Sequence, residues 1–151
     1  MTPWPFTFVD SSALVKRYRN EAGSPSVADL FNRADRIIIS RLTALEVSAA
    51  LVRRGRVAGV LPGDVIATLA ILDRNTQNSF HVVELDSVVI NRAVLLTRWY
   101  GLRAADAIQF SSALFTNDET RPAQLIVLAS DKELNTAAAA EGLKTLDPTE
   151  A

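Results

Sequence analysis

The sequence predicts an α/β fold: a three-layer α/β/α sandwich in which helices cover both faces of a central, mostly parallel sheet of four to five strands. Short β-branched runs alternate along the chain with longer amphipathic segments, as in parallel-sheet proteins. Two of the short runs, RIII at 36–39 and LIVLA at 125–129, are largely apolar, which is typical of strands buried on both faces. With 151 residues and no internal repeat or linker, the chain is expected to form one domain over residues 1–151.

Each element is predicted from its hydrophobic period and its end signals. Strands are expected at residues 6–9, 36–39, 81–85, 125–129 and 144–146. Helices are expected at residues 12–19, 26–34, 42–54, 63–75, 87–100, 104–115 and 132–141. Ser24 followed by Pro25 is typical of a helix N-cap, and Gly55, Gly101 and Gly142 stand where a glycine commonly ends a helix. The polar stretch 117–124 is expected to be a solvated loop.

The composition excludes several kinds of site. The chain has no cysteine, which excludes disulfides, cysteine-bearing zinc sites and thiolate catalysis, and its single histidine, His81, excludes a two-histidine metal site or acid–base pair. The net charge of −1 argues against a strongly basic binder of polyanions. If four carboxylates sit in a metal site, however, 13 acidic and 16 basic residues remain, so the charge does not exclude nucleic acid.

Nothing in the sequence indicates a membrane segment. The apolar runs are far shorter than the ~20 residues that span a bilayer. The first ten residues lack the basic start and the long apolar core of a signal peptide. We therefore expect a cytoplasmic protein without a membrane partner.

Four carboxylates from distant stretches are expected to meet at the carboxyl edge of the sheet. Asp10 ends the first predicted strand, and Asp131 comes just after the fourth. Glu46 lies in the first turns of the helix after the second strand, and Asp106 begins the helix that leads to the fourth. Ligands of open parallel sheets bind at this edge, near a switch in strand order.

Each carboxylate also has a purely structural interpretation. Asp10 and Asp131 can cap the helices that follow them. Glu46 can complete a capping box with Thr43, and Asp106 can favour the positive end of its helix. A shared site is nevertheless favoured, because Asp10, Glu46 and Asp106 are each the only charged residue in a long stretch. An unpaired carboxylate buried among apolar residues is costly.

A hard divalent cation would relieve both the burial and the mutual repulsion of these carboxylates. An all-oxygen site without histidine or cysteine suits Mg²⁺ or Mn²⁺. Such a site fits phosphodiester hydrolysis, in which a metal-activated water attacks in line and no side-chain nucleophile is needed. The chemistry alone does not choose between RNA and DNA.

Four motifs carry a resemblance to a known family: VDSSALVKRY at 9–18, TALEVSAAL at 43–51, LRAADAIQFSSAL at 102–114 and LASDKELNTAAAAEGL at 128–143. In this order, and over essentially the whole chain, they resemble the PIN-domain ribonucleases. Among these they are most similar to the VapC-type toxins of prokaryotic type II toxin–antitoxin systems. The resemblance implies a PIN-like fold and metal-dependent, endonucleolytic cleavage of RNA.

The resemblance also implies the ligands and the partners. Asp10 and Asp106 match the principal ligands of Mg²⁺ or Mn²⁺, with Glu46 next and Asp131 more peripheral. The implied partners are an RNA substrate, a second copy of the chain in a homodimer, and a cognate antitoxin. The antitoxin's tail is expected to bring a basic side chain to the carboxylates.

Several residues are candidates for auxiliary roles. Ser12 matches a hydroxyl residue often found beside the family's site, although serine is also common in the first turn of a helix. The family's Ser or Thr two places before the last acid is replaced here by Ala129, with Ser130 one residue later. Lys16 and Arg19 lie on one helix face after Asp10 and are candidates for holding RNA phosphates.

Other features leave alternatives open. The cluster Arg53, Arg54 and Arg56 fits either phosphate contacts or a favourable helix end. The apolar positions of residues 63–75 are interpreted as core rather than as an interface. A non-catalytic PIN-fold binding module and a DNA-directed nuclease with the same metal chemistry remain as alternative functions. A phosphotransferase with Asp10 as nucleophile is disfavoured, because position 12 is Ser rather than Asp.

Overall fold

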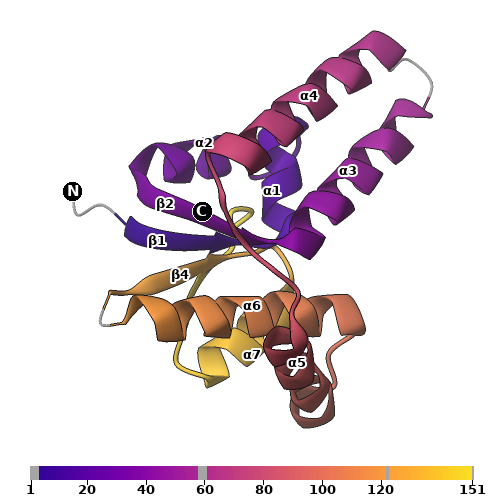
Figure 1. Ribbon diagram of the computed structural model, residues 1–151. Coiled ribbons are helices and arrows are strands. Elements are labelled where there is room, and N and C mark those ends of the chain that lie inside the picture. The colour runs from indigo at the N-terminus through magenta and orange to yellow at the C-terminus, as the bar shows by residue number, and fades with distance from the viewer. Residues whose placement is uncertain (1–3, 58–60, 122, 151) are drawn as a thin grey trace.

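A five-stranded sheet in the order β3-β2-β1-β4-β5 forms the centre of the protein (Figure 1). The structure is a computed structural model that describes residues 4–57, 61–121 and 123–150. The strands are β1 (Trp4–Val9), β2 (Ala34–Ser40), β3 (His81–Val83), β4 (Leu125–Leu128) and β5 (Lys144–Leu146). Every pairing between them is parallel, which confirms the predicted fold class.

Helices cover both faces of the sheet (Figure 1). One face carries α1 (Ser11–Tyr18), α2 (Ser24–Arg33), α3 (Arg41–Gly55) and α4 (Pro62–Asn78). The other face carries α5 (Ser87–Tyr100), α6 (Ala104–Thr120) and α7 (Lys132–Ala140). Within the described ranges, no helix is long and apolar enough to cross a membrane.

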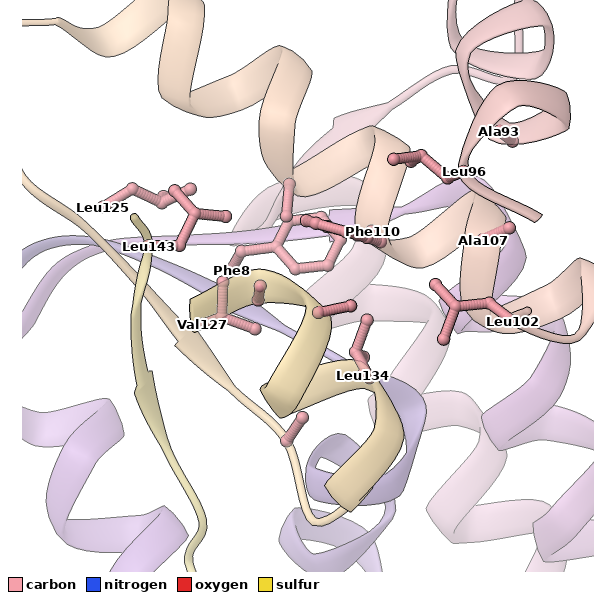
Figure 2. Close-up of a cluster of buried hydrophobic side chains, with 14 of the residues drawn as sticks. Phe8, Ala93, Leu96, Leu102, Ala107, Phe110, Leu125, Val127, Leu134 and Leu143 are labelled. Atoms are coloured by element: carbon pink, nitrogen blue, oxygen red, sulfur yellow. The ribbon is translucent and has the colours of Figure 1, made fainter. Parts of the chain in front are cut away.

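The alternation of side chains along the strands divides the apolar residues between two cores. Phe8 packs on the side of α5, α6 and α7, in a cluster with Phe110, Val127 and Leu134 (Figure 2). Its neighbour Val9 belongs to the second cluster, on the side of α1 to α4. Both faces of the sheet are therefore buried, as the apolar strand runs predict.

The start of α2 differs from the prediction. Its N-cap is Gly23, which lies in the left-handed region with a φ of 91°, and Ser24 is already the first helical residue. The Ser24 hydroxyl binds the preceding turn instead of capping the helix. It accepts a hydrogen bond from the Glu21 amide at 2.9 Å and donates one to the Arg19 carbonyl at 3.1 Å.

Helix ends are predicted with mixed success. Gly101 and Gly142 follow α5 and α7 with φ values of 67° and 82°, as expected for glycines that end helices. Gly55 instead stays helical as the last residue of α3. The end of α6 lies at Thr120, so the first part of the stretch expected as a loop is helical.

The helices α3 and α4 pack against each other and extend beyond the sheet as a pair (Figure 1). Leu72 is the buried residue of α4. Ile66 and Ile71 on the same helix are 68% and 46% exposed. The prediction that the apolar positions of residues 63–75 form core is therefore wrong for Ile66 and Ile71, whereas Leu72 lies in the second core and Leu69 packs against it.

We expect Phe110→Ala to destabilise the protein by about 4 kcal/mol, because Phe110 is fully buried and its removal leaves a cavity between α6 and the sheet. Equilibrium unfolding in urea measures this loss. Val88→Ala on α5 is the control, since Val88 is 58% exposed, and it is expected to cost less than about 0.5 kcal/mol. Equal losses in the two variants would contradict the assignment of the core.

Candidate functional site

The four predicted carboxylates are held by four different elements around the switch in strand order. β1 lies between β2 and β4, so the chain leaves β1 on one side and returns on the other. Asp10 directly follows β1, and Asp131 follows β4 and caps α7. Glu46 lies in the second turn of α3, and Asp106 lies in the first turn of α6. Because β1 and β4 are parallel neighbours, their carboxyl ends meet at this edge.

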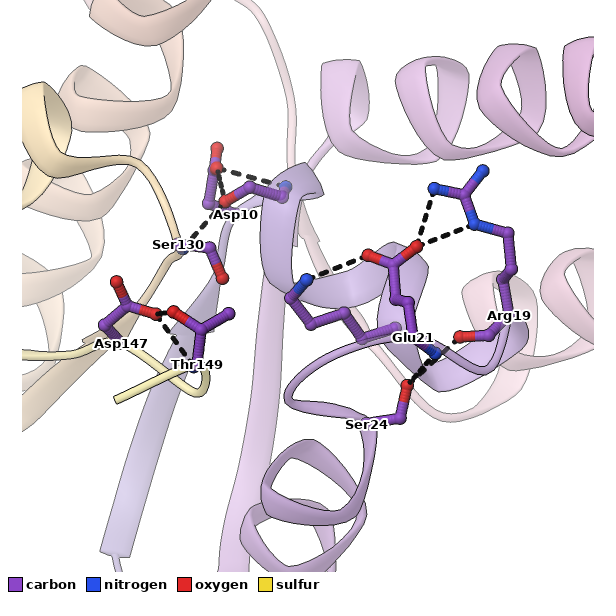
Figure 3. Close-up of polar contacts among 9 residues, drawn as sticks. Asp10, Arg19, Glu21, Ser24, Ser130, Asp147 and Thr149 are labelled. Carbon is purple, nitrogen blue, oxygen red and sulfur yellow. Dashed lines mark hydrogen bonds and ion pairs between the residues drawn. The ribbon is translucent and has the colours of Figure 1, made fainter. Parts of the chain in front are cut away.

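Asp10 is the most buried of the four, with 4% of its surface exposed. Its Oδ2 atom accepts hydrogen bonds from the backbone amide and the hydroxyl of Ser12, at 3.2 and 2.6 Å. The Ser12 hydroxyl in turn accepts a bond from the Ser130 amide at 2.9 Å (Figure 3). Burial raises the pKa of Asp10 to about 6. The charges of Glu46 and Asp131 also raise this pKa, whereas the two hydrogen bonds from Ser12 lower it.

Asp106 is half-buried and interacts with all three other carboxylates. Burial raises its pKa to about 6, and the charges of Asp131, Asp10 and Glu46 add to this rise. A hydrogen bond with Asp131 further favours the protonated form of Asp106. Asp131 itself accepts a bond from the Leu134 amide at 3.0 Å, as an N-cap does. The mutual repulsion shows that the four side chains share one electrostatic environment.

Glu46 does not take part in a capping box with Thr43, the structural alternative that the sequence offers. The box is formed one turn earlier, between Ser40 as N-cap and Thr43. The Glu46 side chain therefore plays no part in capping α3. Its Oε1 atom accepts hydrogen bonds from the Ser11 hydroxyl at 2.6 Å and from Nε2 of Gln109 at 3.1 Å.

Ser11 and Gln109 are contact residues that the sequence reasoning did not identify. Gln109 is 1% exposed and lies three residues after Asp106, on the same side of α6. An amide side chain in the otherwise apolar stretch AIQF is the signal that indicates its role. Ser11 carries no comparable signal, because a serine at the start of a helix is ordinary.

No lysine or arginine neutralises this acidic cluster among the ion pairs of the described residues. Lys16, a candidate for phosphate binding, is 2.8 Å from Glu21, and Arg19 is 2.6 Å from the same carboxylate (Figure 3). These bonds hold the pKa of Glu21 below its ordinary value, although burial opposes them. Both cations are thus paired with Glu21 in this structure, and their role in holding RNA phosphates stays a prediction.

The chemistry of the donor set fits a hard divalent cation, because all four side chains offer carboxylate oxygens and lack a neutralising partner. In the described part of the chain, however, no three acidic side chains are arranged around a common metal position. One oxygen of Asp10 and one of Glu46 are held by protein donors instead. The carboxylates are gathered at one edge without forming a closed metal cage.

Comparison with known proteins places this arrangement in a family. The PIN domain family matches residues 7–140. Ribonuclease VapC45 of Mycobacterium tuberculosis (strain CDC 1551 / Oshkosh) is 33% identical over 151 residues, which cover 95% of this chain and 99% of that protein.

Solved structures share the fold at low sequence identity. A toxin–antitoxin complex from Klebsiella pneumoniae matches with a TM-score of 0.64 and 16% identity, over 94% of this chain and 97% of that one. VapC20 of Mycobacterium tuberculosis, described as a sarcin–ricin loop cleaving toxin, matches with a TM-score of 0.64 and 18% identity, over 87% of this chain and 94% of that one.

We expect the metal-free protein to be less stable at pH 7 than at pH 5. A folded pKa of about 6 against an ordinary 3.8 means that native Asp10 and Asp106 keep protons that the unfolded chain releases, so stability falls as pH rises through this window. Asp10→Asn removes the more buried charge. It should raise the stability of the metal-free protein at pH 7 by about 2 kcal/mol, or roughly 5 °C in melting temperature.

Thermal unfolding in EDTA at the two pH values measures this effect. Asp73→Asn, which removes an exposed carboxylate on α4, is the matched control and should leave the melting temperature unchanged. A lower melting temperature for Asp10→Asn than for the control at pH 7 would contradict the conclusion that Asp10 is buried without a partner for its negative charge.

Proposed function

The chain belongs to the PIN domain family, among the relatives of the VapC ribonucleases, and from this premise we propose that it is a metal-dependent endoribonuclease and the toxin of a type II toxin–antitoxin pair. The proposal rests on one observation above all: four carboxylates meet at the switch in strand order without a paired cation among the described residues. Ligands of open parallel sheets bind at this place.

We assign Asp10 and Asp106 as the principal ligands of Mg²⁺ or Mn²⁺, with Glu46 next and Asp131 more peripheral. All-oxygen donors suit these ions. A bound ion supplies positive charge for the phosphodiester and a water of lowered pKa for its hydrolysis. Because the carboxylates do not surround a common position, we expect some of their side chains to rotate when the ion binds.

The chain's own donors support this assignment by holding one oxygen of a ligand and leaving the other open. Ser12 binds Oδ2 of Asp10, while Ser11 and Gln109 bind Oε1 of Glu46. Among the described residues, no hydrogen bond is formed to Oδ1 of Asp10 or Oε2 of Glu46. Ser130 contributes its backbone amide, which fixes the Ser12 hydroxyl, rather than its own side chain.

Two basic residues beside the site are suited to hold the phosphates of an RNA strand. Arg103 precedes α6, three residues before Asp106, and Lys132 directly follows Asp131. Both are exposed, and neither takes part in the ion pairs of the described residues. Arg41 at the same edge is instead paired with Glu84.

The proposed partners are a cognate antitoxin and a second copy of the chain. Large apolar side chains are exposed on and beside the α3–α4 pair and on α5, and exposed apolar side chains that gather on a surface commonly mark interaction sites. They are Leu45, Val52, Val57, Leu61, Ile66 and Ile71 on and beside the α3–α4 pair, and Val88, Val94, Leu95 and Trp99 on α5. Sedimentation of the purified chain tests the homodimer, and a monomer at every concentration would exclude it. A cytoplasmic location remains part of this proposal.

We expect the purified protein to cleave a mixed RNA pool in Mn²⁺ or Mg²⁺ and to leave single-stranded DNA intact. EDTA and Asp106→Asn should each reduce cleavage to background, because both remove the cation from the site. Asp73→Asn is the control that keeps activity, and gel analysis of the products measures cleavage. Expression of the wild-type chain, but not of Asp106→Asn, should arrest growth of a bacterial host.

Other outcomes would select the alternatives. Metal-dependent cleavage of DNA in preference to RNA would indicate a DNA-directed nuclease. Absence of cleavage together with no binding of millimolar Mn²⁺ in calorimetry would indicate a non-catalytic binding module. Cleavage that survives both EDTA and Asp106→Asn would place the activity outside this protein's acidic site.

We expect the double variant Arg103→Ala, Lys132→Ala to weaken RNA binding by about tenfold or more, and to lower the slope of log affinity against log salt by about 1.4, because two phosphate contacts are lost. Binding is measured in the Asp106→Asn background at several salt concentrations. Arg36→Ala, near the amino end of β2, is the control. An unchanged salt slope would place the phosphate contacts elsewhere.

A further inference from the structure

Both hydrogen bonds to the Glu46 carboxylate are made to the same oxygen atom. The Ser11 hydroxyl and the Gln109 amide both donate to Oε1, at 2.6 and 3.1 Å. Gln109 also donates to the Ser11 hydroxyl at 3.0 Å, so the three side chains close a ring of contacts. Glu46 is thereby fixed through one oxygen only.

Two hydroxyl groups at the start of α3 bind the carbonyl end of the Gln109 side chain. Its Oε1 atom accepts hydrogen bonds from the hydroxyls of Ser40 and Thr43, at 2.9 and 3.0 Å. Because the Glu46 carboxylate only accepts hydrogen bonds, the NH2 end of the amide faces Glu46 and Ser11, and the carbonyl end faces the two hydroxyls. The hydroxyls at the start of α3 therefore complete the hydrogen bonds of the carbonyl end, while the carboxylate determines which end of the amide it meets.

The amide of Gln109 is fully satisfied although it is almost completely buried. A glutamine side chain offers two donor hydrogens and two acceptor lone pairs, and all four are used here. A buried position that serves only packing is filled as well by an apolar residue of similar volume. A complete polar network that ends on a carboxylate of the acidic cluster indicates that orientation of this carboxylate is the purpose.

The network also joins the helices that carry the acidic residues. Gln109 lies three residues after Asp106 on α6, Glu46 lies on α3, and Ser11 follows Asp10 at the start of α1. A change in the position of any one of these helices would break at least one of the four bonds.

We propose that Gln109 is the positioning residue for Glu46: it holds Oε1 so that Oε2 stays available to the divalent cation. This inference rests on the proposed metal-dependent function. It makes Gln109 an indirect contributor, because its side chain contacts Glu46 and not the substrate.

Three variants test the role of Gln109. Gln109→Leu removes all four hydrogen bonds at similar volume. Gln109→Glu keeps the shape and the acceptors for Ser40 and Thr43, but places a carboxylate against Glu46. Ser111→Ala is the matched control, because it removes another buried polar group of α6. The Ser111 hydroxyl donates a hydrogen bond to the Val89 carbonyl at 2.6 Å.

We expect Gln109→Leu and Gln109→Glu to weaken Mn²⁺ binding and to lower kcat by about tenfold or more each, as losses of residues that orient metal ligands commonly do. The KM for RNA should stay near the wild-type value. Ser111→Ala should lower the melting temperature but keep the Mn²⁺ affinity and kcat. A Gln109→Leu protein that binds Mn²⁺ and cleaves RNA as well as this control would overturn the proposal.

A second measurement needs no metal and no activity. In EDTA, Gln109→Glu should lower the melting temperature, because two carboxylates then face each other. Adding Glu46→Gln should restore it, because the exchanged pair re-forms the amide–carboxylate hydrogen bond, while Mn²⁺ binding stays weak. If the double variant Gln109→Glu, Glu46→Gln melts no higher than Gln109→Glu alone, the hydrogen bond between residues 109 and 46 is absent and the proposal fails.

These measurements test the proposed nuclease function and the positioning role of Gln109 separately. If the wild-type chain neither binds Mn²⁺ nor cleaves RNA, the proposed function fails. The melting temperatures in EDTA then still decide whether Gln109 holds Glu46. If the wild-type chain is active and Gln109→Leu is indistinguishable from Ser111→Ala, the proposed function stands and the positioning role fails.

Discussion

Crowding of like charge at one edge of the sheet is the constraint to which the surrounding structure responds. The parallel pairing of β1 with β4 brings the residues after both strands to one place, and the helices α3 and α6 begin at the same edge. Burial, with the repulsion between the carboxylates added to it, raises the pKa of Asp10 and of Asp106 to about 6. The fold thus imposes an electrostatic cost that packing elsewhere in the domain must offset.

Neutral donors, rather than cations, hold the carboxylates in place. Ser12 orients Asp10, the Leu134 amide orients Asp131, and Ser11 with Gln109 orients Glu46. Such donors fix a direction without cancelling the charge. Lys16, on the helix that follows Asp10, is bound to Glu21 instead. Because the charge of the cluster is left uncancelled, its attraction for an external cation is preserved.

The sequence predicts positions at the sheet edge well, because the order of strands and helices alone determines where each strand ends. It predicts contacts between side chains poorly, because these depend on how distant elements pack. The bond between Gln109 and Glu46 joins residues 63 positions apart. The apolar surroundings of Gln109 in the sequence indicate that its amide needs a partner, but they do not identify Glu46 as that partner. Helical periodicity likewise identifies an apolar face on α4, but does not show that the helix extends beyond the sheet and leaves Ile66 exposed.

A single substitution at this edge of the sheet would make the metal-free domain more stable. That the chain nevertheless carries the destabilising carboxylates is therefore evidence for a functional role. An asparagine in place of Asp10, or a lysine directed at the cluster, would reduce the repulsion and leave the sheet and its two cores unchanged. Either change would also weaken the property that draws a divalent cation to the site. Strain of this kind is commonly retained where function needs it. The residues that destabilise the metal-free domain are thus the same residues that the proposed chemistry requires, and the ordered hydroxyl and amide donors around them limit the disorder that the repulsion would otherwise cause.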